Sequence, residues 1–239
     1  MATDAHCFYC FDVLASHLLG ERQPHSLSKF QSLVQKKRSL PPPRGEALTN
    51  GVGALPARMP LFVTWKKRSA SGHMDLRGCI GTFDAKPLEA GLRDYALTAG
   101  LHDHRFGSIS AKELPHLQCG VTLLTDFETA ADPMDWTLGV HGIQIEFTYH
   151  QRKMGATYLP DVPSEQGWTP QETIISLMRK AGWTGKREEW KKIPLRVTRY
   201  QGKVHSVSWE GYQAMLKEFK ENGEEEETEG DEKQAVACN

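Results

Sequence analysis

Several features that mark whole classes of protein are missing from this sequence. Its 239 residues contain no apolar run near the roughly 20 residues needed to span a bilayer, so we expect no membrane-embedded segment. The first ten residues show no basic stretch followed by an apolar block, which predicts no secretory signal. The five cysteines are odd in number and scattered, which argues against a disulfide framework and favours a reducing compartment. We therefore expect a cytoplasmic or nuclear protein.

Motifs for common cofactors and metals are also missing. There is no glycine-rich phosphate loop, no serine nucleophile elbow and no paired zinc motif. Cys7 and Cys10 form a C-x-x-C pair, but they fall on the apolar face of a predicted helix, which favours packing over redox or metal chemistry. His102 and His104 have the spacing of strand or loop ligands without any third ligand indicated. We expect neither a metal nor a cofactor.

Net charge is small but unevenly distributed. The chain has 29 Lys and Arg against 30 Asp and Glu, a formal net charge of −1. Residues 221–239 hold eight of the acids and one base, which leaves 28 bases and 22 acids, or +6, on residues 1–220. An excess this weak argues against nucleic acid as a partner. Residues 221–239 are predicted to form an acidic, disordered tail.

The apolar pattern divides the rest of the chain into ordered and irregular parts. Apolar residues at helical spacing between residues 7 and 18 predict a helix that ends near Gly20. From residue 23 to residue 56 the composition turns polar and proline-rich, which predicts an inserted disordered loop. We therefore expect one domain, formed by residues 1–22 and 57–220.

Strands and helices are interspersed along this domain. We expect two strands joined by a turn at Ser71-Gly72, and a hairpin turned at Gln201-Gly202. A capping box at Thr169–Glu172 predicts the start of a helix that ends at Gly182. The full set of predicted strands is 61–65, 76–80, 119–125, 140–147, 156–159, 195–200 and 203–207, with helices following residues 87, 169 and 211. Hairpins rather than regular βαβ units indicate an α+β fold with a mostly antiparallel sheet.

The octapeptide over residues 76–83 is the most informative segment for function. Gly78 and Gly81 flank Cys79, and glycine lets backbone N–H groups approach and hold an anion. Arg77 adds a fixed positive charge that would stabilise a thiolate or a bound carboxylate. Cys79 could then act as a nucleophile whose oxyanion is held by neighbouring amides. The expected ligand-binding residues around it are Arg77, Gly78, Gly81 and Thr82.

A structural interpretation of the octapeptide stays open beside this one. Two glycines can form a β-bulge, and free cysteine is among the residue types most often buried. His141 is the second candidate catalytic residue, because Gly139 and Gly142 flank it much as glycines flank Cys79. A turn histidine bonded to backbone explains the same pattern, so both interpretations of His141 stay open as well.

The octapeptide also resembles the signature of the AMME chromosomal-region (AMMECR) domain family. Further segments resemble that family in the same order over residues 7–209, among them Leu61–Lys66, Val121–Thr125, Asp135-Trp136, Gly139–Ile143 and Ala156–Pro160. The resemblance implies an α+β fold in which two related β-and-α repeats share a barrel-like, mostly antiparallel sheet.

The resemblance carries no established activity with it. Prokaryotic relatives often neighbour Memo-type and radical SAM proteins, which implies small-molecule chemistry and a functional link to Memo-type proteins. Two hypotheses follow. The first is a cofactor-free enzyme that acts through Cys79 on a small carboxylate-bearing molecule. The alternative is a non-catalytic regulatory module that binds a protein or small ligand through the signature segment.

Overall fold

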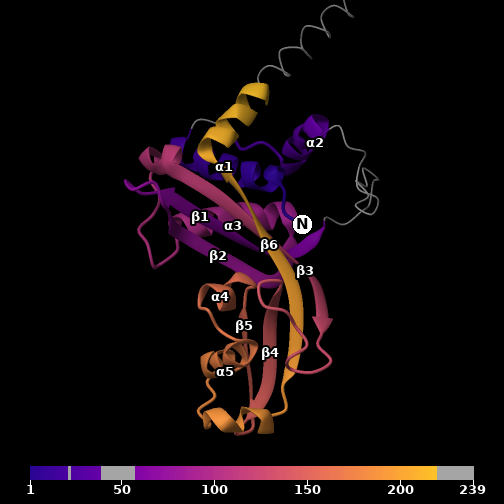
Figure 1. Cartoon of the computed structure of the whole chain (residues 1–239). Helices are drawn as coiled ribbons and strands as arrows, with labels where there is room; N and C mark the ends of the chain where they lie inside the picture. The colour runs from indigo at the N-terminus through magenta and orange to yellow at the C-terminus, as the bar shows by residue number, and fades with distance from the viewer. Residues whose placement is uncertain (21–22, 39–56, 220–239) are drawn as a thin grey trace, which may run out of the picture. The chain divides into compact units, whose positions relative to one another are not determined.

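The computed structural model describes residues 1–20, 23–38 and 57–219 (Figure 1). The helices are α1 (Asp4–Leu19), α2 (Leu27–Arg38), α3 (Leu88–Leu101), α4 (Asp161–Glu165), α5 (Pro170–Lys180) and a last helix over residues 209–219. The strands are β1 (Arg58–Arg68), β2 (Met74–Pro87), β3 (Leu117–Thr129), β4 (His141–Tyr149), β5 (Arg152–Tyr158) and β6 (Arg196–Ser208). Short 3-10 helices cover Ala111–His116 and Arg187–Lys192.

All six strands belong to one sheet, in the order β2-β1-β3-β6-β4-β5. The pairs β1–β2, β4–β5 and β4–β6 are antiparallel. The expected α+β class and antiparallel sheet are thus confirmed. None of the helices in the described ranges has the length and apolar character to cross a membrane.

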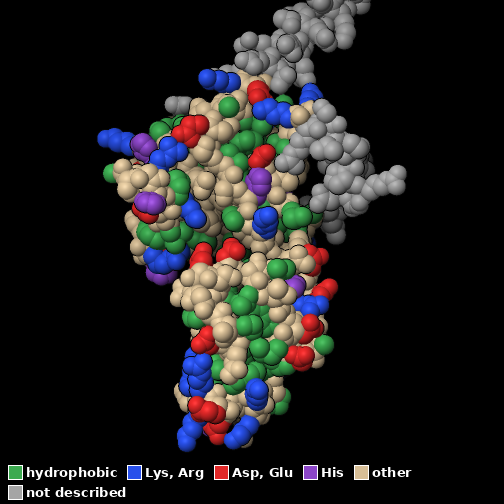
Figure 2. All heavy atoms as spheres, viewed as in Figure 1, with side chains coloured by type: hydrophobic (Ala, Val, Ile, Leu, Met, Phe, Trp, Pro, Cys, Tyr) green, Lys and Arg blue, Asp and Glu red, His purple; other side chains and the backbone are tan. Residues whose placement is uncertain are grey.

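Contacts within the chain divide it into two compact units. Unit 1 comprises Met1–Ala2, Phe83–Ala85 and Thr122–Val204; unit 2 comprises Thr3–Thr82, Lys86–Val121 and His205–Asn239. Charged side chains of both signs are interspersed on the face seen in Figure 2.

Unit 2 begins with the helix that the sequence predicts. A capping box between Thr3 and His6 starts α1, and Gly20 ends it in the left-handed conformation, with φ +67°. In β1 alternate residues are buried, as expected for a strand with one face on a core. Gly72, with φ +87°, lies in the turn that leads to β2, so the predicted β1–β2 hairpin is confirmed.

The prediction of a disordered loop over residues 23–56 is wrong for its first part. Residues Leu27–Arg38 form α2, in which Leu27, Phe30 and Val34 are buried. Their spacing of three and four residues is helical, but the surrounding lysines, serines and glutamines hid it. Phe30 packs near Phe8 of α1, with ring centroids 6.3 Å apart, so α2 belongs to the core of unit 2. Residues 39–56 and the predicted tail 221–239 lie outside the described residues.

Unit 1 is built on β4 and α5. Ile143, Ile145 and Phe147 alternate along β4 and are buried with apolar residues of α5. The capping box at Thr169 and the left-handed Gly182 that follows α5, with φ +104°, agree with the predicted start and stop.

The predicted hairpin at Gln201-Gly202 is wrong, because β6 runs straight through both residues. Gln201 pairs with His141 of β4, and Gly202 has no positive φ of the kind a tight hairpin turn needs. A Cβ added at Gly202 would lie 2.7 Å from Leu124 Cδ2. This glycine therefore permits close packing within the sheet rather than a change of direction.

Candidate functional site

Cys79 lies on β2, at one edge of the sheet, opposite Thr64 of β1. Its side chain is half-buried, and its Sγ atom is 3.1 Å from Thr64 Oγ1. A cysteine nucleophile is usually activated by an adjacent general base, and a threonine hydroxyl does not serve as one. Within the described part of unit 2, no basic side chain is hydrogen-bonded to the Cys79 sulfur.

The backbone of Cys79 is held by two side chains from the segment after α3. The Cys79 N–H donates to Asp103 Oδ2 at 2.9 Å, and the Cys79 carbonyl accepts from Arg105 Nη2 at 3.0 Å. Because β2 is an edge strand, backbone groups on its outer side have no neighbouring strand to pair with. Asp103 and Arg105, which we call the Cys79 clamp, take the place of that strand at this one residue.

The clamp is a strong, preformed ion pair. Asp103 is only 3% exposed, and Arg105 Nη2 lies 2.7 Å from its Oδ2 atom. Hydrogen bonds from the Arg105 side chain outweigh burial and hold the pKa of Asp103 far below its usual range. The bond to Asp103 in turn raises the pKa of Arg105. The Arg105 side chain remains 47% exposed, so the cationic partner of the clamp is the one that also faces solvent.

Arg77 is engaged by other groups of unit 2. Its Nε and Nη2 atoms lie 3.0 and 3.3 Å from the two carboxylate oxygens of Glu113. Its Nη1 and Nη2 atoms also donate to the carbonyls of Gly107 and Ser108. The carboxylate that Arg77 binds in this structure is therefore one from its own chain.

Glu113 is the centre of that second network. Lys67 Nζ lies 2.9 Å from Glu113 Oε1, and the Ser110 N–H donates to Oε2 at 2.9 Å. Burial by itself would raise the pKa of Glu113, but the bonds from Arg77, Ser110 and Lys67 together lower it to about 2. The network ties the end of the β1–β2 hairpin to the segment before β3.

The glycines beside Cys79 are required by close packing, which the sequence does not show. A Cβ added at Gly78 would fall on the carbonyl oxygen of Ala99 in α3, and one at Gly81 would fall on the carbonyl oxygen of Leu61. Neither glycine has a positive φ. They let α3 and β1 approach β2 closely, and the amide of Cys79 between them is already bonded to Asp103. Thr82 lies opposite Leu61 in the same strand pair.

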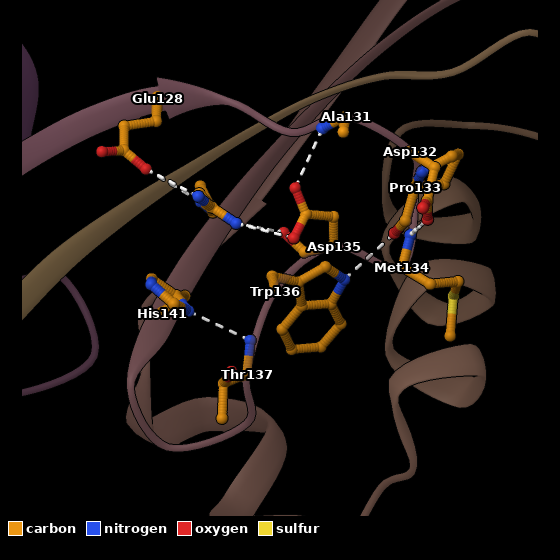
Figure 3. Close-up of polar contacts among 10 residues, drawn as sticks. Glu128, Ala131, Asp132, Pro133, Met134, Asp135, Trp136, Thr137 and His141 are labelled. Carbon is orange, nitrogen blue, oxygen red and sulfur yellow. Dashed lines mark hydrogen bonds and ion pairs between the residues drawn. The ribbon is translucent and has the colours of Figure 1, made fainter.

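His141 is the first residue of β4 and belongs to unit 1 (Figure 3). Its Nδ1 atom accepts a hydrogen bond from the Thr137 N–H at 3.0 Å. Gly139, with φ +73°, turns the chain just before it, and a Cβ added at Gly142 would fall on the Tyr200 ring. This is the geometry of a turn histidine bonded to backbone. The two candidate catalytic residues thus lie in different units, each with its own contacts.

Two carboxylates near His141, Glu128 and Asp135, bind the same arginine, and Figure 3 labels both acids and the histidine. Arg199 Nη2 is 2.8 Å from Glu128 Oε2, and Arg199 Nη1 is 2.8 Å from Asp135 Oδ1. The Ala131 N–H is the main cause that lowers the pKa of Asp135, and Arg199 adds to it. The Glu128 and Asp135 side chains are 57% and 40% exposed, so this cluster is a surface feature of unit 1.

The sequence analysis missed Asp103, Arg105 and Glu113. In the segment containing the first two, the sequence draws attention to the histidines, which are exposed, whereas the buried residue is the acid between them. Cys7, Cys10 and Cys119 are fully buried, as expected of packing residues, and burial raises the pKa of Cys119. In the described ranges no group of three or more His, Cys, Asp or Glu side chains is arranged to hold a metal ion.

Comparison with known proteins gives relatives along most of the chain. An uncharacterised protein of Arabidopsis thaliana is 45% identical over 211 residues, covering 87% of this chain and 86% of the relative. One of Schizosaccharomyces pombe is 36% identical over 208 residues, covering 87% and 93%. The crystal structure of an uncharacterised protein from Pyrococcus horikoshii superposes with a TM-score of 0.55 at 21% identity, covering 86% of this chain and 93% of that one.

The structural likeness at this low identity establishes the fold alone. The family follows from the sequence matches, since the AMMECR1 family profile matches residues 7–205, which include the Cys79 clamp, the Glu113 network and the His141 turn. The chain belongs to the AMMECR1 family.

Proposed function

We propose that this chain is a non-catalytic binding module, and that the Cys79 clamp is where it contacts a carboxylate or similar anion on its ligand. One observation carries the proposal. The N–H and the carbonyl of Cys79 are both occupied by the clamp, while the Arg105 side chain that occupies the carbonyl is still nearly half exposed.

Acyl transfer at Cys79 is disfavoured because the backbone groups of this residue are already hydrogen-bonded. A thiol nucleophile needs a base to activate it and free N–H donors to hold the oxyanion. Here the nearest polar side chain is the Thr64 hydroxyl, and the N–H of Cys79 is already donated to a buried carboxylate. A substrate oxyanion would have to displace Asp103, which is itself held by Arg105.

The same contacts favour binding, because they orient Arg105 before any ligand arrives. Its Nε and Nη2 atoms are tied to Asp103, and Nη2 also reaches the Cys79 carbonyl. Its Nη1 atom makes no hydrogen bond to the described residues of the chain. A guanidinium fixed on one side and exposed on the other suits a planar carboxylate, with little conformational entropy left to lose.

Catalysis through Cys79 on a small carboxylate-bearing molecule is the second candidate function. It is favoured by the exposure of Cys79, which is the one cysteine in the described ranges that is not buried. Arg105 Nη2 donates to the Cys79 carbonyl at 3.0 Å, which puts a positive charge beside this residue. A positive neighbour of this kind is typical of reactive cysteines.

Alkylation kinetics separate the two functions. In a Cys238→Ser protein, Cys79 is the accessible thiol, and its reaction with iodoacetamide can be compared with that of glutathione between about pH 6 and 9. A binding module should react more slowly than glutathione at every pH, because the sulfur is half-buried and bonded to Thr64. Faster reaction than glutathione below neutral pH would favour the enzyme.

Protection from alkylation then tests the binding function directly. Acetate, succinate and citrate are added at millimolar concentration, and at least one should slow labelling of Cys79. Arg105→Gln should abolish the protection, and Arg105→Lys should retain part of it. Arg93→Gln is the matched control, because Arg93 is exposed on α3 and pairs with its neighbour Asp94. Protection by none of the three, or protection that survives Arg105→Gln, would reject the proposal.

A further inference from the structure

A groove in unit 2 has the properties of a second ligand site, built from none of the residues discussed above. It lies among the end of α1, the start of α2 and the helix over residues 209–219, and its volume is 560 Å³. Trp209, Leu216 and Phe219 form much of its apolar wall. From the polar groups that face it, we infer that this groove binds a small molecule with a flat apolar body and one carboxylate group.

The size and lining suit a small molecule. Ligand pockets in proteins are commonly about 300–1,000 Å³, mostly apolar, with a few polar groups that set orientation. Two aromatic rings on one helix offer surfaces on which a planar apolar body can stack. The volume thus points to a compact ligand rather than to a folded partner.

Buried polar contacts hold the walls of the groove in place. Asp12 is fully buried, and it accepts hydrogen bonds from the Tyr212 hydroxyl at 2.7 Å and from the His25 N–H at 2.6 Å. The His25 ring stacks on Phe219, with centroids 4.7 Å apart and planes 11° apart. These contacts join α1, the segment before α2 and the last helix, so the groove is formed without a ligand and binding need not order it.

Two polar groups of the groove lack partners among the described residues. Ser16 lines the groove, and its buried hydroxyl makes no hydrogen bond. Such an unsatisfied group is costly in a native structure, but its oxygen is closed to solvent, so it does not choose the ligand. Lys29 is exposed at the groove and makes no ion pair in the described part of the chain. Because Lys29 is positively charged, we expect the ligand to carry a carboxylate rather than an amine or a neutral group at this position.

The chain's own residues 220–239 are a poorer occupant on composition. This stretch follows directly after Phe219, and its first thirteen residues contain no large apolar side chain. Its carboxylates match the charge of Lys29, but these first residues offer no apolar side chain to fill the aromatic wall. The test below treats it as a competing outcome.

The experiment uses the full chain and two matched probes, 2-naphthoate and its neutral analogue 2-naphthamide. Binding is followed by tryptophan fluorescence and by amide NMR shifts. We expect 2-naphthoate to bind more tightly, and Lys29→Gln to weaken it about three-fold while leaving 2-naphthamide unchanged, as for an exposed ion pair. Lys29→Arg should retain the preference, and Lys112→Gln, an exposed lysine of the same unit, is the control.

A blocking variant and a tail variant complete the design. Gln213→Trp should weaken binding of both probes by filling the groove, because Gln213 lines it and is partly exposed; if this variant fails to fold, the exposed Lys29 variants still decide the question. No binding of 2-naphthoate, or equal binding in the Lys29→Gln protein, would overturn the inference. It would also be overturned if replacing Glu224–Glu227 by glutamine raised the affinity severalfold, because the acidic stretch would then be the natural occupant.

Discussion

The segments around Cys79 and His141 look alike in sequence and differ in the structure. Each has glycines close to a candidate catalytic residue. At Cys79 the glycines allow backbone contact with α3 and β1. At His141 one glycine makes a left-handed turn, and the other makes room for the Tyr200 ring. Flanking glycines thus report a close approach or a turn of the chain, and by themselves they do not indicate a ligand.

The ion pairs beside the two segments differ in burial. Asp103 is almost fully buried and binds the backbone of the candidate residue itself, whereas Asp135 is 40% exposed and accepts from the Ala131 N–H of its own loop. Exposed ion pairs contribute little to stability, while breaking a buried one leaves polar groups without partners. We therefore expect the Cys79 segment to be much less tolerant of change than the His141 segment.

The largest effect is expected from Gly78→Ala. Because the new Cβ would meet a backbone carbonyl rather than a flexible side chain, α3 must shift, and we expect a loss above about 3 kcal/mol in urea unfolding. Gly107→Ala is the control, since nothing lies within 4 Å of its added Cβ and its φ is not positive. A control variant as unstable as Gly78→Ala would contradict the packing explanation.

Asp103→Ala should come next, with a loss of about 3 kcal/mol. The N–H of Cys79 and the guanidinium of Arg105 both lose their acceptor. Asp103→Asn should cost less, because an amide oxygen can still accept from Cys79. Asp135→Ala is the matched change in unit 1 and should lower the melting temperature less; an equal or larger drop would break the contrast between the two segments.

Acid should weaken unit 2 through Glu113. The pKa of this carboxyl is about 2 in the folded protein, below its ordinary value of 4.5, so the folded state favours the ionised form. The resulting stability is present above pH 4.5 and is lost as the pH falls toward 2, by up to about 3 kcal/mol. Urea unfolding across this range should show the loss, and the free energy of unfolding of Glu113→Gln should depend less on pH. An equal dependence on pH in the variant would show that other groups cause the acid sensitivity.

The smallest effect is expected at His141. His141→Asn keeps an acceptor for the Thr137 N–H, so we expect a change below about 0.5 kcal/mol, and His141→Ala about 1 kcal/mol. Thermal melting of both variants checks this. A loss as large as that of Asp103→Ala would show that His141 is a structural centre of unit 1 and not a turn histidine.

Sequence reasoning succeeded where a few neighbouring residues decide the outcome. Gly20 and Gly182 end helices because they adopt positive φ, and Thr169 starts one because its side chain and that of Glu172 cap each other. It failed at α2, where three apolar residues are enough to hold the helix against the core because Phe8 of α1 packs near Phe30. It failed again at Gly202, since a glycine required by packing looks the same in sequence as one required by a turn.

Local sequence patterns predict the helix ends, the β1–β2 hairpin, the alternating burial of β4 and the family. The chemistry of the candidate site depends on contacts between residues far apart in the chain. Arg77 binds Glu113, 36 residues away, and Cys79 is bound by Asp103, 24 residues away. The physical reason is that an edge strand leaves backbone groups unpaired, and which side chain reaches them depends on where α3 packs. The position of α3 depends on Gly78, because only a residue without a side chain leaves room for the backbone of α3. The sequence shows the glycine but not the element that packs against it.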